Sequence, residues 1–481
     1  MLSQLHHLAL KKITGIAPRY LPFADVATEE VPLSRLLRLS LFQITVGMAL
    51  VLLAGTLNRV MIVELNVPAA LVACMLALPL VFAPFRTLIG FRSDTHVSAL
   101  GWKRVPYIWK GTMYQFGGFA IMPFALLVLS GYGDAIDAPR WIGLSSAAIA
   151  FLLVGAGVHM VQTVGLALAT DLVRQEDQPK VVGLMYVMLL AGMVVSALVF
   201  GWLLQNYTPG RLVQVIQGSA VLTVALNLLA MWKQEARNRN RAREMSSARK
   251  ASFVASWKAL IKQAGATPLL MMIGLGTFGF GMADVLLEPY GGQALGFSVA
   301  STTKLTALLA VGTLFGFAFA SKNLAAGGSP MRLAWIGALI GIPSFGAIIL
   351  SSAAAGSGMP LFLIGTLGIG LGAGLFSHAT LTATIRRAAP DQIGLALGAW
   401  GAVQATCAGL GIALAGIIRD AIVVSGVTEN ALVAPYNYVF ALDILFLGCA
   451  VLVALFSAIK SGSTLASPGG TQAKTKPVEV P

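Results

Sequence analysis

Long apolar runs, separated by short polar connections, follow one another along the whole chain. A helix that spans a bilayer needs about 20 mainly apolar residues, and twelve segments meet this requirement. These predicted spans are 36–58, 68–89, 106–130, 141–170, 181–203, 211–232, 267–290, 300–321, 332–351, 358–383, 392–416 and 434–459. The pattern predicts an all-α integral membrane protein with 12 transmembrane helices.

Composition agrees with this prediction. Hydrophobic residues make up 57% of the 481 residues and charged residues only 11%, whereas a soluble domain has about 25% charged residues. The 52 glycines also fit, because small residues let membrane helices approach closely. Cys74, Cys407 and Cys449 all lie in apolar runs, which indicates neither a metal site nor a disulfide framework.

The distribution of basic residues predicts the orientation, since Lys and Arg concentrate in cytoplasmic loops. If the N-terminus is cytoplasmic, the outer side holds only five of the 33 basic residues: Arg59, Arg140, Arg211, Lys304 and Arg419. This asymmetry favours an even number of spans with both termini in the cytoplasm. The net charge of +14 therefore reflects topology and contact with membrane lipids, and we expect no nucleic-acid partner.

A basic connection divides the spans into two sets of six. It covers residues 233–266, and its basic residues indicate a linker touching anionic lipid or, as the alternative, a docking site for a partner. The predicted domains are an N-terminal segment 1–35, a six-helix bundle 36–232, the linker, a second bundle 267–459 and a tail 460–481. The N-terminal segment is either an amphipathic cytoplasmic helix or a disordered terminus.

Weak internal repeats relate the two sets. GAGVH in the fourth predicted span is echoed by GAGLFSH in the tenth, and the polar exit of the first span is echoed after the seventh. Parallel repeats of this kind are typical of transporters built from two halves. We therefore expect two pseudo-symmetric six-helix bundles.

The connection GFRSDTHVSALGWKR, residues 90–104, carries unusually many charges for this chain. It resembles the signature loop of the major facilitator superfamily, with Gly90, Asp94, Gly101, Lys103 and Arg104 as the matching residues. The resemblance implies a cytoplasmic latch, in which Asp94 caps a helix N-terminus and the basic residues reach acids such as Asp171. The gap between Asp94 and Gly101 is longer than in the superfamily pattern, so a plain solvated loop is the alternative.

Several longer segments are more specific. TLNRVMIVEL, FRTLIGFRSDTH, GWKRVPYIWKGTMYQFGGFAIMPFALL, ATDLVRQEDQPKVVGLMYVMLLAGM and GMADVLLEPYGGQALGFSV resemble the PucC/LhaA family of purple phototrophic bacteria. This family is the bacteriochlorophyll-delivery branch of the major facilitator superfamily. The resemblance covers nearly all of residues 20–460 and is nearer to the LhaA type.

The resemblance implies the major facilitator fold and an assembly factor, not an enzyme. Such a protein binds bacteriochlorophyll or delivers it to light-harvesting antenna polypeptides in the bacterial inner (intracytoplasmic photosynthetic) membrane. Bacteriochlorophyll synthase and the membrane-insertion machinery are further candidate partners. Two alternatives stay open, a small-solute transporter and a pigment-free scaffold for antenna assembly.

A pigment carrier needs an apolar slot and an axial ligand for the pigment magnesium, and neutral imidazole is the commonest side-chain metal ligand. Of five histidines, only His159 and His378 lie in predicted spans, at near-equivalent positions of the two halves. The nearby Gly157 and Gly374 leave room for a flat ring or for close helix contact. Hydrogen bonding of each histidine to a neighbouring helix is the alternative. We expect no metal site apart from the pigment magnesium and see no catalytic motif.

Ionisable residues inside a membrane are unfavourable and invite functional hypotheses. Asn58 and Arg59 lie at the outer end of the first span, and Asp284 and Glu288 lie in the outer part of the seventh. Arg59 is expected either to pair with Asp284 or Glu288 as an outer gate or to extend separately to the headgroups. Asp443 is assigned to the outer part of the last span, so no carboxylate is expected clearly at the midplane.

Overall fold

The computed structural model describes residues 31–81, 89, 93, 102, 104–131, 135, 137–174, 177–235, 265–353, 358–387, 393–426 and 432–465. All regular elements within these ranges are helical. Eleven of the described helices are long and apolar enough to cross a membrane. The expected span 68–89 begins as α4 (Ala69–Val81), and most of the residues that follow lie outside the described ranges. The all-α, multi-pass membrane fold is confirmed.

The helices of the first half are α2 (Leu33–Leu39), α3 (Leu41–Leu50), α4, α6 (Val105–Ser130), α7 (Arg140–Asp171), α8 (Gln178–Leu203) and α9 (Pro209–Met231). The first span, Leu33–Glu64, continues beyond α3 through two π-helical segments, Val51–Leu57 and Val60–Glu64. We call this whole span helix 1. Its wider turns change which residues face each other along the helix.

The second half contains α12 (Ala266–Gly281), α13 (Ala283–Gln293), α14 (Val299–Ala325), α15 (Pro330–Ser351), α16 (Gly358–Arg387), α17 (Ile393–Ser425) and α18 (Ala434–Leu465). α12 and α13 form one span that is interrupted at Met282. Pro289 lies inside α13. Because proline lacks an N–H, the carbonyl of Val285 has no helical donor from that position.

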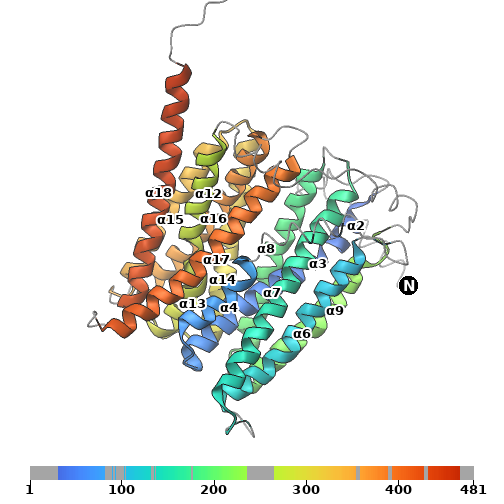
Figure 1. Cartoon of the computed structure of the whole chain (residues 1–481), viewed down its shortest axis with the longest axis vertical. Coiled ribbons are helices and arrows are strands. Elements are labelled where there is room, and N and C mark those ends of the chain that lie inside the picture. Colours follow the sequence, from blue (N-terminus) through green and yellow to red (C-terminus); the bar gives the residue numbers. More distant parts are fainter. Residues whose placement is uncertain are drawn as a thin grey trace, which may run out of the picture.

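Buried apolar side chains form two cores that follow the two halves. One core draws almost entirely on residues before 232 and the other on residues after 268. Figure 1 shows the corresponding bundles, with the blue-to-green helices beside the yellow-to-red ones. The bundles touch where α4 meets α17 and where α8 meets α14. We call the end where α2 begins and α18 ends the inner end, and the opposite end the outer end.

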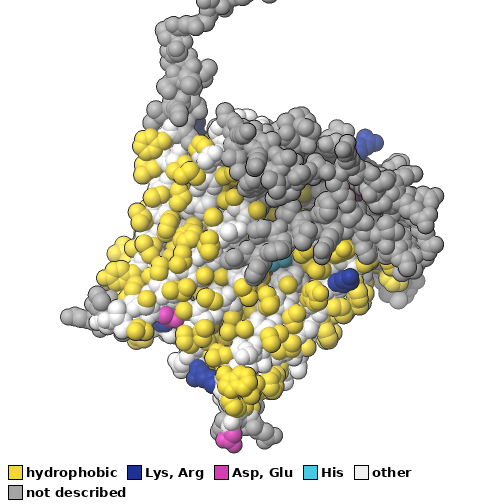
Figure 2. Space-filling model, viewed as in Figure 1, with side chains coloured by type: hydrophobic (Ala, Val, Ile, Leu, Met, Phe, Trp, Pro, Cys, Tyr) yellow, Lys and Arg dark blue, Asp and Glu magenta, His cyan; other side chains and the backbone are white. Residues whose placement is uncertain are grey.

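The visible surface suits a lipid environment. Figure 2 shows hydrophobic side chains over the middle of one face, with few charged groups among them. Trp141, Trp202 and Trp232 are exposed near the ends of their helices. Tryptophan is enriched at the membrane–water interface, where its amphipathic ring is stable. These positions are consistent with an apolar band bounded by aromatic side chains.

Candidate functional site

Asn58 joins the two halves near the outer end. Its fully buried side chain donates from Nδ2 to the Val285 carbonyl at 2.8 Å and to the Ala54 carbonyl of its own helix at 3.0 Å. The Val285 carbonyl is the one that Pro289 leaves without a helical donor. The proline therefore creates an acceptor on α13 that an amide of helix 1 satisfies. We call this contact region, with the contacts of Arg59 and Glu288 described next, the outer seam.

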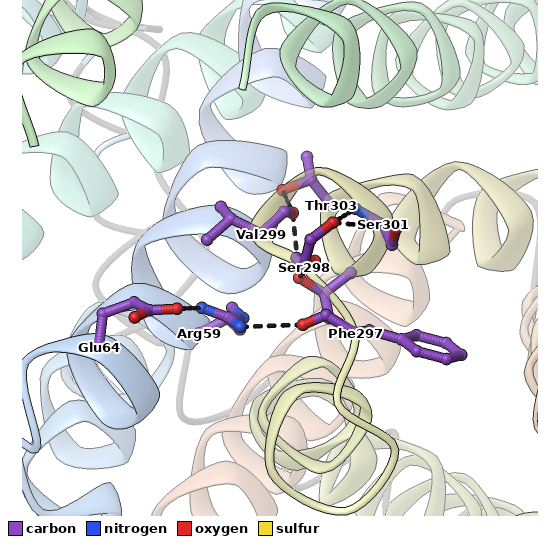
Figure 3. Close-up of polar contacts among 8 residues, drawn as sticks. Arg59, Glu64, Phe297, Ser298, Val299, Ser301 and Thr303 are labelled. Atoms are coloured by element: carbon purple, nitrogen blue, oxygen red, sulfur yellow. Dashed lines mark hydrogen bonds and ion pairs between the residues drawn. The ribbon is translucent and has the colours of Figure 1, made fainter. Parts of the chain in front are cut away.

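Arg59 also crosses between the halves, but not as expected. Its buried guanidinium forms an ion pair with Glu64 of its own helix and donates from Nη2 to the Phe297 carbonyl at 3.0 Å (Figure 3). Neither Asp284 nor Glu288 forms an ion pair with Arg59 among the described residues. The expected cross-half ion pair is thus replaced by a charge-assisted bond to a backbone carbonyl.

Glu288 is buried on α13 within the outer seam. Its Oε1 accepts a hydrogen bond from Thr306 of α14, while Oε2 is enclosed and has no hydrogen-bond partner in the described part of the chain. Helix 1 approaches closely, because a Cβ built on Gly55 would lie 2.7 Å from Oε1. Asp284, one turn earlier on α13, is exposed. The seam thus holds one poorly satisfied acid.

Asp443 lies in the outer half of α18 (Ala434–Leu465), as the sequence assigned it, and it is completely buried. Neither carboxylate oxygen has a hydrogen-bond partner within the described residues, and Asp284 is near enough to act on it electrostatically. Asp443 is therefore a second buried acid, and it has no hydrogen-bond donor in the described part of the chain.

At the inner end, Arg104 forms the contact that the latch hypothesis named. Its Nε lies 3.1 Å from Asp171 Oδ2, and its Nη1 donates to Ser93 Oγ at 2.6 Å. Arg104 is buried, so these contacts fix the start of α6 against the end of α7. The other predicted latch residues, Gly90, Asp94, Gly101 and Lys103, lie outside the described residues.

Glu235 is an inner contact that sequence reasoning missed. Its Oε2 accepts from the backbone N–H of Arg104 and of Val105, both at 3.0 Å, at the start of α6. A carboxylate at a helix N-terminus satisfies free N–H groups and interacts favourably with the helix dipole. Glu235 follows α9, some 130 positions away in the chain, and its sequence context gives no signal for this contact. It ties the start of the linker to α6.

The two candidate pigment ligands differ in their surroundings. His159 is buried on α7, whereas the His378 ring on α16 is half-buried and lies 4.8 Å, centroid to centroid, from Phe317 of α14. Phe317 in turn lies 6.3 Å from the Tyr186 ring of the other half. Nδ1 of His378 is enclosed, with no hydrogen-bond partner in the described ranges. The accessible edge of this imidazole is therefore the one that carries Nε2.

Neighbouring helices occupy the space beside the two glycines that were candidates for pigment binding. A Cβ built on Gly157 would lie 2.5 Å from the Gly111 carbonyl oxygen of α6, and one on Gly374 would lie 2.3 Å from the Thr313 carbonyl oxygen of α14. Such distances leave no room for a side chain, still less for a macrocycle. Gly157 and Gly374 therefore serve close contact between helices. The alternative, that they leave room for the flat ring of a pigment, was wrong.

The fold defines the class of protein first. A solved bacterial homologue of the human lysosomal transporter Spinster matches with a TM-score of 0.65 at 15% identity, over 91% of this chain and 98% of the homologue. A D-xylose–proton symporter matches with a TM-score of 0.63 at 16% identity, over 88% and 96% of the two chains. The protein therefore has the fold of the major facilitator transporters. At these identities the likeness shows the fold alone.

The sequence comparisons then give the family. The model of the PUCC protein family matches residues 56–460. Protein PucC of Rhodobacter capsulatus is 67% identical over 93% of this chain and 97% of its own, and that of Rhodovulum sulfidophilum is 61% identical over 91% and 96%. The chain belongs to the PucC family, as its motifs predicted. Nothing in these matches shows the finer expectation of an LhaA type.

A more distant relative has an informative name. The protein described as the 44.5 kDa chain of bacteriochlorophyll synthase from Rhodobacter capsulatus is 26% identical over 78% of this chain and 85% of its own. The printed name connects that relative with bacteriochlorophyll synthesis.

Proposed function

We propose that this protein is a non-enzymatic carrier that binds bacteriochlorophyll in the photosynthetic inner membrane and delivers it to light-harvesting antenna polypeptides. The proposal places both termini in the cytoplasm. Bacteriochlorophyll synthase is the natural donor of the pigment, and the insertion machinery the natural source of new antenna polypeptides. Family membership supports the pigment class.

The environment of His378 is the observation that carries the proposal. A magnesium tetrapyrrole needs one axial ligand and a flat apolar neighbour, and the accessible Nε2 edge beside Phe317 offers both. Tyr186 extends the aromatic surface from the other half. In this arrangement the imidazole binds the magnesium and the aromatic rings contact the macrocycle. His159 is more enclosed and is the weaker candidate.

Absorption of the purified protein tests the proposal. The chain is expressed in a bacteriochlorophyll-producing host, purified in mild detergent and examined for near-infrared pigment bands. The carrier should retain pigment in a fixed ratio to protein. A preparation that binds antenna polypeptides but never pigment would favour the scaffold instead, and solute flux in pigment-free vesicles would favour a small-solute transporter.

A further inference from the structure

Glu288 sits between the two halves with too few donors for a carboxylate. Its side chain is 3% exposed, Thr306 supplies its single hydrogen bond, and Oε2 has no partner in the described part of the chain. An ionised carboxylate presents about four acceptor sites, and burying it unsatisfied is strongly unfavourable. A neutral carboxylic acid therefore fits this position better than a carboxylate does.

The positive groups around Glu288 have their polar contacts elsewhere, although the charge of Arg59 still acts on Glu288 across the seam. Arg59 faces it from helix 1, but the guanidinium is bound to Glu64 and to the Phe297 carbonyl. Lys304 of α14 is exposed and packs against Gly201 of α8. Arg419 of α17 pairs with its neighbour, Asp420. None of these cations forms an ion pair with Glu288 among the described residues.

Two further acids lie on the elements that pack around Glu288. Asp284 lies one turn away on the same helix, and Asp443 of α18 acts on Asp284 electrostatically. Repulsion among carboxylates in a low-dielectric interior disfavours charging all of them. Glu288 is the buried acid that lies at the contact between the two halves, so its enclosure depends on that contact.

We propose that Glu288 is a proton-binding site coupled to the outer seam. While the halves touch, the carboxyl keeps its proton. When the seam opens, the O–H bond transfers its proton to water, and the resulting carboxylate is hydrated. The closed form then binds one proton more than the open form, so low pH favours closure and high pH favours opening. This inference goes beyond the proposed function and holds for any cargo.

Distances between spin labels across the outer end test this coupling. Trp202→Cys on α8 and Val424→Cys on α17 place labels at exposed outer positions of the two halves, in a chain whose three native cysteines are replaced by serine. In nanodiscs, we expect the open-to-closed ratio to rise with pH. The rise should approach about tenfold per pH unit where one proton is released.

Three variants locate the proton. Glu288→Gln should remain closed and lose the pH response, while Glu288→Asp should restore it. Asp443→Asn is the matched control, because it neutralises a buried acid for which no contact with the first half is seen among the described residues, and it should keep the response. The proposal is overturned if the wild type shows no response, or if Glu288→Gln responds as the wild type does.

Infrared spectroscopy provides a measurement that does not depend on folding of the glutamine variant. The wild type should show the C=O stretch of a protonated carboxylic acid at low pH, and that band should vanish with the same midpoint as the distance change. A band that stays constant while the distances change would overturn the proposal. Its failure would leave pigment binding untouched, since that is measured separately by absorption.

Discussion

His378 and His159 occupy similar places in the two halves but present their imidazoles differently. His378 is partly exposed and its ring lies tilted against Phe317, whereas His159 is 9% exposed. The sequence predicted both as candidates because position alone could not reveal side-chain exposure. At the scale of residues, the structure therefore ranks two histidines that the sequence left equal.

His378→Leu should lower pigment occupancy about tenfold, which corresponds to about 1.4 kcal/mol of binding free energy. The reason is the loss of the axial nitrogen while an apolar side chain of similar bulk is retained. Pigment-to-protein absorbance ratios of the purified variants measure this. His159→Leu is the matched control and should reduce occupancy less. Equal loss in both variants would contradict the ranking.

The partners of Arg59 could not be predicted from the sequence. Its charge and burial near the outer end were predictable, but its partner was not. Glu64 is five residues away. Side chains at this spacing point in different directions in an α-helix, whereas a π-helical turn brings them close together. The Leu65 N–H bonds to the Val60 carbonyl, as such a turn requires. Hydrophobic periodicity carries no signal for that turn.

The helices themselves were largely predictable, because the bilayer imposes a length and an apolar composition on each. Their irregularities were less so. Pro289 indicates from the sequence that the Val285 carbonyl of α13 needs a hydrogen-bond donor from elsewhere, and Asn58 is that donor. The contact of Glu235 with α6 gives no such signal, since it joins segments remote in sequence.

Gly374 lets α16 pack closely against α14. Gly374→Ala should destabilise the protein by about 1–3 kcal/mol, because the new methyl group meets the backbone of α14. Thermal unfolding in detergent measures the loss. Gly448→Ala on α18 is the control and should be neutral, since no atom of another described element lies within 4 Å of its Cβ position. Unchanged stability in Gly374→Ala would argue against tight packing there.

The division into two bundles was predictable from the repeats and the basic linker, and the two buried cores follow it. The bonds of Asn58 and Arg59 across the outer seam were not, because they depend on backbone carbonyls exposed by a proline and by a turn. Those contacts decide how firmly the outer end is closed. The outer seam is thus the main feature of the whole molecule that the structure reveals and the sequence did not predict.

Asn58→Ala should shift the protein toward an open outer end. The substitution leaves the Val285 carbonyl buried without its donor, which costs the closed form about 1–3 kcal/mol. The spin pair at positions 202 and 424 should report a larger open population. Asn323→Ala removes an amide whose one bond among the described residues is to its own helix, and it should leave the distances unchanged. A closed population equal to that of the wild type would contradict this role of Asn58.

Transfer of bound pigment to antenna polypeptides can be followed by absorption spectroscopy. Purified protein loaded with bacteriochlorophyll is mixed with pigment-free antenna polypeptides in lipid vesicles, and the absorption band of the assembled antenna is followed over time. A carrier should assemble the antenna faster than the same amount of free pigment does, while its own bound band declines in step. Equal rates with bound and free pigment, or pigment that never leaves the protein, would contradict the account.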